Sequence, residues 1–159
     1  HGVPPVSTGY NNTYQIFQTP DHIAILVENI HDVRVIPLDG RTRLTAGIRQ
    51  WNGDSRGHWE GDTLVVETRN FSEKTQHRFP SSSDTIAVER LRRLDDNTIE
   101  HTFTIEDNSV YTEPWTGMRH MPRLSEYIIY EYACHEGNYA MTNILSAERT
   151  GEADASNEQ

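Results

Sequence analysis

Histidine and carboxylate side chains that could move protons occur at three places along the chain. The first place follows the apolar run that ends at Glu28. The second lies in and just after the glycine-rich stretch 40–57, and the third is the end of the apolar run 128–135. A histidine beside a carboxylate titrates near neutral pH and can act as a general acid or base. Since loops and strand ends gather at the mouth of a small β-barrel, a pocket there would hold them. The candidate catalytic residues are His31, Asp54, His58, Glu131, His135 and Glu136. The alternative is that they form ordinary ion pairs and caps.

The chain also has eight histidines, which raises the question of a bound metal. A catalytic metal centre needs about three protein ligands at one point. Neither an HExxH motif nor an HxH pair occurs, which weakens the case for a cupin metal centre. Metal and cofactor therefore stay open.

Aromatic residues and one arginine could line a pocket for a sugar, aryl or terpenoid ligand. Aromatic side chains supply large apolar surfaces for such ligands, but they serve more often to pack strand faces. The candidate ligand-binding residues are Trp51, Arg56, Trp59, Trp115 and Tyr130.

Two further patterns suggest nucleophilic chemistry and have simpler explanations. The string from Gly53 to Gly57 fits G-x-S-x-G, but that motif needs a strand-to-helix turn, and a β-hairpin is expected next. Cys134 is the single cysteine, and a lone cysteine most often packs as a small hydrophobe. Neither pattern predicts a serine or cysteine hydrolase.

The net charge and the hydropathy of the chain exclude several kinds of binding partner. The formal net charge is −10, and no basic face is evident that could neutralise the phosphates of a nucleic acid. An anionic membrane surface is disfavoured for the same reason. No apolar run approaches the ~18 residues of a membrane span. The partners we expect are a small-molecule substrate or further copies of the chain.

Period-two patterns and turn signals predict an all-β, antiparallel fold of eight or nine strands. The apolar run His22–Glu28 predicts a strand covered on both faces. In Thr98–Glu106 the side chains of Ile99, His101, Phe103 and Ile105 share one face, which is typical of a half-buried strand. Other expected strands are 13–18, 33–37, 58–60, 63–68, 85–94, 110–121 and 128–135, with long loops at 40–57 and 69–84.

Hairpins in sequence favour a meander, which hides its edges by closing into a barrel or by packing as a sandwich. We expect a lipocalin-like or cupin-like barrel over residues 13–149, after an irregular lead-in at residues 1–12. One short helix is expected at 138–149, with Asn138 as its N-cap. Residues 150–159 are expected to form a loose polar tail.

Several segments together resemble the C-terminal region of a large family of uncharacterised exported bacterial proteins. The resemblance spans most of residues 10–149, and its most specific strings are GDSRGHWEGDTLVV and YEYACHEGN. It implies a periplasmic or extracellular location and carries no activity. It also implies an upstream cysteine in related chains, which would be a disulfide partner for Cys134.

Three hypotheses about function follow. The first is a secreted enzyme that uses histidine and carboxylate acid–base chemistry in a barrel pocket, on a small organic or sugar substrate. The second is an extracellular structural or assembly subunit, which predicts a filled interior and large subunit contacts. The third is a small-molecule-binding module with an apolar cavity.

Overall fold

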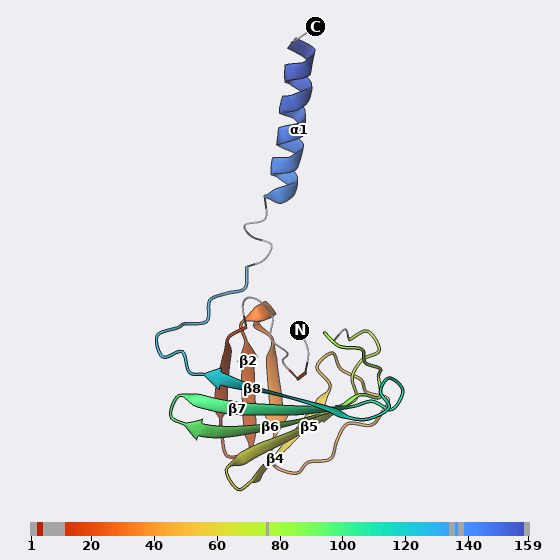
Figure 1. Cartoon of the computed structure of the whole chain (residues 1–159), viewed down its shortest axis with the longest axis vertical. Coiled ribbons are helices and arrows are strands. Elements are labelled where there is room, and N and C mark those ends of the chain that lie inside the picture. Colours follow the sequence, from red (N-terminus) through yellow and green to blue (C-terminus); the bar gives the residue numbers. More distant parts are fainter. Residues whose placement is uncertain (1–2, 5–11, 76, 134–135, 137–138, 158–159) are drawn as a thin grey trace.

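A computed structural model describes residues 3–4, 12–75, 77–133, 136 and 139–157, and within them eight strands form two antiparallel sheets (Figure 1). The three-stranded sheet has the order β1-β2-β3, formed by Tyr14–Gln18, His22–Val27 and Val33–Pro37. The five-stranded sheet has the order β4-β5-β6-β7-β8, formed by Asp54–Glu60, Thr63–Arg69, Ile86–Asp95, Thr98–Glu106 and Trp115–Pro122. The predicted antiparallel, β-rich class is confirmed.

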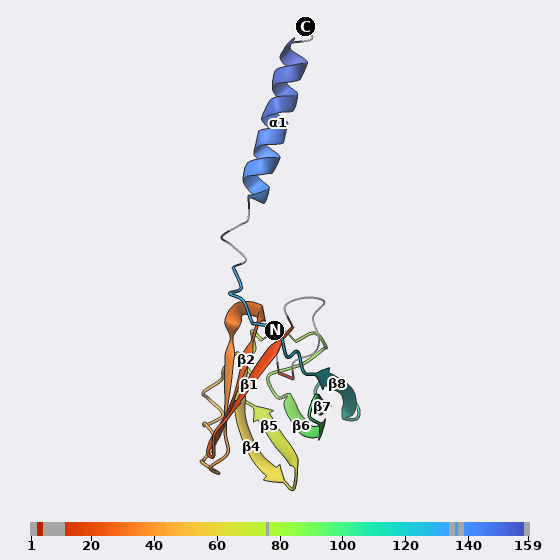
Figure 2. The same cartoon turned by 90° about the vertical axis from the view of Figure 1, so that its left-hand side faces the viewer.

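The two sheets pack face to face as two layers, and their strands cross (Figures 1 and 2). Ile23, Ile25 and Ile36 of the three-stranded sheet are buried against Leu64 and Val66 of β5. Alternate residues of a strand point to opposite faces, so these side chains form the inner faces of both sheets. Their burial is the main apolar contact between the layers.

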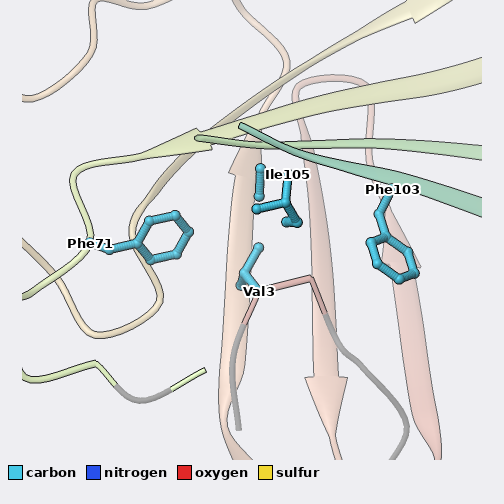
Figure 3. Packing of buried hydrophobic residues seen from close by; sticks show 5 residues of the cluster. Val3, Phe71, Phe103 and Ile105 are labelled. Atoms are coloured by element: carbon cyan, nitrogen blue, oxygen red, sulfur yellow. The ribbon is translucent and has the colours of Figure 1, made fainter. Parts of the chain in front are cut away.

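A second apolar cluster lies where the lead-in of the chain enters the core. Val3, Phe71, Ala87, Phe103 and Ile105 are buried together, and Figure 3 shows Val3 and Ile105 between the rings of Phe71 and Phe103. Val3 belongs to the segment expected to be an irregular lead-in, so at this point the lead-in is part of the core. The remaining residues of that segment, apart from Pro4 and Asn12, lie outside the described residues.

A buried polar network joins the two layers. The guanidinium of Arg34 on β3 lies 2.5 Å from the Glu89 carboxylate on β6 and donates to the Ser55 and Thr68 hydroxyls, at 3.0 and 2.7 Å. Glu89 also pairs with the His101 ring on β7, at 3.1 Å. These five side chains are buried. A charge in such a place is tolerated only when it is paired and hydrogen-bonded.

The network continues toward the edge of the sheet through Arg119 on β8. The Arg119 Nε donates to His101 Nδ1 at 3.2 Å, so the proton of a neutral His101 ring lies on Nε2 and faces Glu89. The Arg119 guanidinium also lies 5.5 Å from the centre of the Tyr14 ring on β1, a cation–π contact. Polar side chains therefore connect β3 with β6, β7 and β8, and Arg119 connects β8 with β1.

The lipocalin-like or cupin-like barrel is not seen. Within the described residues no strand pairing joins the two sheets, so both remain open. The physical reason is that the sheets stack through their faces, and residues 38–53 carry the chain from one layer to the other without pairing β3 with β4.

Two expectations about the C-terminal region are corrected. Residues 128–133 of the strand expected at 128–135 do not form a strand, although their side chains suit one. The helix α1 spans Ala140–Asn157, so it continues into the segment expected to be a loose tail. Figures 1 and 2 show α1 standing away from both sheets. The expected N-cap Asn138 lies outside the described residues.

The glycine-rich segment 40–57 is a loop only in its first part, because β4 begins at Asp54. Gly53, with a φ of +68°, precedes the strand and packs against β5 and Phe71. Gly57 lies against Leu38 and Ile36, where a Cβ would meet the Leu38 side chain at 2.8 Å. Close packing explains Gly57, whereas Gly53 combines close packing with a positive φ that favours glycine.

Candidate functional site

The structure places the predicted catalytic residues on separate elements. His31 is exposed in the turn after β2, where the short 3-10 helix Asn29–His31 has positive φ values at Ile30 and His31. Asp54 and His58 lie on β4, with Asp54 buried and His58 exposed. Glu131 and Glu136 are exposed in the connection to α1, and His135 lies outside the described residues. Among the described candidates, Asp54 and His58 share a strand and project from the same face of it, but Asp54 is buried and His58 is exposed.

The described residues do not form a metal-binding site. Among the described residues, no group of three or more His, Cys, Asp or Glu side chains is placed to hold an ion. Cys134 lies outside them.

A polar groove lies where the loop after β3 passes over β4. It encloses about 340 Å³ and is lined by Pro37, Gly40, Arg41, Arg43, Arg56, Gly57, His58 and Glu67. Three guanidinium groups and one imidazole therefore face it with one carboxylate. We call this site the arginine groove. It contains two of the predicted site residues, Arg56 and His58.

Asp54 supports the arginine groove from below and does not line it. Its buried carboxylate accepts hydrogen bonds from the Leu44 amide at 3.0 Å and from the Arg56 guanidinium. Arg56 also donates to the carbonyl oxygens of Arg41 and Thr42, at 3.3 and 3.1 Å. Asp54 therefore fixes Arg56 and the loop above it, which is a positioning role.

Arg43 and Glu67 form the other fixed pair of the groove. Arg43 donates to Glu67 Oε1 at 2.7 Å and to the Asp54 carbonyl at 2.9 Å. Burial is the main reason that the pKa of Arg43 is lowered, and the neighbouring charges of Arg69 and Arg56 lower it further. The negative charges of Glu67 and Asp54 act in the opposite direction and raise it. The hydrogen bond from Arg69 is the main reason that the pKa of Glu67 is lowered. The lowered pKa of Glu67 favours its ionised form, which is the counter-ion of Arg43.

His58 stands at the exposed rim of the groove. Its Nε2 lies 3.2 Å from Glu60 Oε1, and Arg90 donates to Glu60 Oε2 at 2.7 Å. The Arg90 hydrogen bond, followed by that of His58, lowers the pKa of Glu60. Glu60 is therefore ionised at neutral pH and serves poorly as a general acid.

The predicted ligand-binding aromatic residues lie on four separate parts of the described structure. Trp51, Trp59 and Tyr130 are exposed on a loop, on β4 and on the connection to α1. Trp115 belongs to the core, where its ring meets Phe79, Phe103 and Tyr111 edge-on. The packing interpretation is therefore correct for Trp115.

An uncovered apolar surface on the three-stranded sheet was missed from the sequence. Strand register places Phe17, Ala24 and Val35 side by side, with Leu26 beside Val33. Phe17, Val33 and Val35 are 49%, 51% and 55% exposed. We call these five residues the outer face. The apolar run of β2 was interpreted as a strand covered on both faces, but here only the inner face is covered.

The connection from β8 to α1 carries a second set of exposed apolar residues. The Tyr127 hydroxyl donates to the buried Glu28 carboxylate at 2.5 Å, which ties the connection to the end of β2. This bond is the main reason that the pKa of Glu28 is lowered. Beyond it, Ile128 and Tyr130 are each 70% exposed.

Helix α1 has its own apolar stripe. Met141, Ile144 and Leu145 are exposed and lie at the i, i+3, i+4 spacing that places side chains on one helix face. In the described chain no helix is long and apolar enough to cross a membrane. An apolar stripe of this kind is typical of a helix that packs against another surface.

Comparison with known proteins adds no assignment: no family model, no curated protein and no solved structure matches the chain.

Proposed function

We propose that the protein is an assembly subunit that pairs with a second copy of itself. In each pair, the apolar stripe of α1 from one copy packs on the outer face of the other copy. The observation that carries this is the presence, on one chain, of an uncovered apolar sheet face and an unpacked apolar helix stripe.

The chemistry of the two surfaces supports this pairing. Sheets and helices are stable when each apolar face is buried against another element. On the outer face Phe17, Val33 and Val35 are about half exposed, and Ala24 and Leu26 are partly exposed. The three residues of the stripe are all exposed. With a net charge of −10, two copies repel each other, so an apolar contact has to supply the attraction.

The path of the chain favours a second copy over the chain's own sheet. The Tyr127 bond to Glu28 anchors the connection at the end of β2, and from there the chain leads α1 away from both sheets (Figure 2). If each copy places its α1 stripe on the outer face of the other, the same contact forms twice and the result is a two-fold symmetric dimer. It also covers the second face of β2, as the apolar run His22–Glu28 predicts.

Two sequence-based hypotheses remain predictions beside this one. The secreted acid–base enzyme needs its histidines and carboxylates to converge, and the arginine groove brings His58 and Glu67 to one concave site. The periplasmic or extracellular location follows from the family resemblance and is compatible with an assembly role.

Sedimentation velocity over a range of concentrations tests the proposal. Wild type is expected to form a dimer, whereas V35K on the outer face is expected to be a monomer, because the substitution places a charge in the apolar contact. M118K is the matched control, since Met118 is an exposed apolar residue on the five-stranded sheet. A monomeric wild type, or a V35K variant that dimerises as wild type does, would overturn the proposal.

A further inference from the structure

The arginine groove offers chemistry that self-association does not use. The whole chain holds 14 lysines and arginines against 24 aspartates and glutamates. Three of those arginines nonetheless line one groove, together with His58 and a single carboxylate, Glu67. Each guanidinium has a carboxylate partner, Asp39, Glu67 or Asp54, so what the groove offers a ligand is a cluster of oriented guanidinium donors.

Structural ion pairing explains the orientation of the guanidiniums but not their exposure to the groove. Arg56 has acceptors at Asp54, Ser55, Arg41 and Thr42, and these fix the plane of its guanidinium. Arg43 is fixed in the same way by Glu67 and Asp54. The two groups are therefore held in place before any ligand arrives, which lowers the entropy cost of binding.

Arg41 completes the cationic lining from the loop side. It donates to both oxygens of Asp39, at 2.9 and 2.6 Å, and it is more exposed than the other two arginines. A guanidinium presents a flat fork of donors that matches the oxygens of carboxylates and phosphates.

We infer that the arginine groove binds a small molecule through a carboxylate or phosphate group, which is held by Arg41, Arg43 and Arg56. The groove's volume of about 340 Å³ is at the lower end of ligand pockets, so the ligand is small. Carboxylates and phosphates share this oxyanion chemistry, and the two are separated by the choice of probe. Attraction to the anion depends on charge, so binding weakens as salt concentration rises.

Isothermal titration calorimetry of the full chain with inorganic phosphate and, separately, with succinate tests this inference. At least one of the two anions is expected to bind with a Kd below about 1 mM. R43K keeps the charge but loses the fork, and R41A removes an exposed guanidinium. Each is expected to weaken binding about tenfold. R41A removes the exposed ion pair with Asp39 and a contact with His22, so it is expected to leave the fold intact. It therefore tests the inference even if R43K loosens the loop.

R92A is the control variant, because Arg92 forms an exposed ion pair with Glu100 on the five-stranded sheet and does not line the groove. It is expected to bind as wild type does. Binding of phosphate alone would assign a tetrahedral ligand group, and binding of succinate alone a carboxylate. If neither anion binds, or if both R41A and R43K bind as tightly as wild type, the inference is wrong.

Discussion

The guanidinium of Arg34 on the three-stranded sheet lies 2.5 Å from the carboxylate of Glu89 on the five-stranded sheet, and both side chains are buried. Ser55, Thr68 and His101 supply the remaining hydrogen bonds of the pair. The contact fixes how one sheet lies on the other. A buried ion pair satisfied in this way adds specificity to the packing, since a shifted layer would leave a charge without a partner.

Replacement of Glu89 by glutamine is therefore expected to destabilise the fold by about 3–5 kcal/mol, because Arg34 keeps its buried charge and loses its counter-ion. Urea unfolding measures the change. E100Q is the control, since the Glu100 pair with Arg92 is far more exposed and is worth about 0–1 kcal/mol. Equal effects of the two substitutions would show that the buried pair has no special role.

Acid is expected to weaken the fold through the same carboxylate. Burial alone would raise the pKa of Glu89, but Arg34 and His101 outweigh it and lower the pKa from 4.5 to about 2. A lowered folded-state pKa contributes stability that is present above about pH 4.5 and is lost as pH falls toward about 2. Urea unfolding across this range should show the loss in wild type and a shallower slope in E89Q.

Part of the acid response should remain in E89Q because of Asp107. Burial opposes its ionisation, but hydrogen bonds from Thr85 and Ser82 lower its pKa to about 2. An E89Q variant whose stability falls with acid as steeply as that of wild type would contradict the role given to Glu89.

A comparison of alanine substitutions at Gly53 and Gly40 distinguishes the cost of steric crowding from the cost of backbone strain, because both glycines have the same backbone conformation. Gly53 and Gly40 have φ values of +68° and +69°, but a Cβ at Gly53 would lie 2.7 Å from the Arg69 carbonyl oxygen, whereas Gly40 has open space. G53A is therefore expected to cost about 1–3 kcal/mol more than G40A in thermal unfolding. Equal costs would mean that the chain before β4 yields easily.

The strands could be predicted where the signal is local. Val33–Pro37 and Thr98–Glu106 have the predicted bounds, and His101, Phe103 and Ile105 are buried on the face that the period-two pattern indicated. The Gly61-Asp62 turn also joins β4 and β5 as expected. These features depend on neighbouring residues alone.

The prediction failed where the outcome depends on distant partners. Residues 128–133 have strand-forming side chains, but a strand forms only beside another strand, and no edge receives them in the described chain. The pairing of Arg34 with Glu89 could not be inferred, since neither residue belongs to a motif. Asp54 was recognised as notable, but its burial makes it a support for Arg56.

The central claim is that α1 of one copy packs on the outer face of another. Isotope-filtered NOE spectroscopy on a mixture of ¹³C-labelled and unlabelled protein observes only contacts between copies. The account predicts NOEs between the Val33 or Val35 methyl groups of one copy and the Ile144 or Leu145 methyl groups of the other. NOEs between these residues that occur only within one copy, or none in a dimer that forms through another surface, would contradict it.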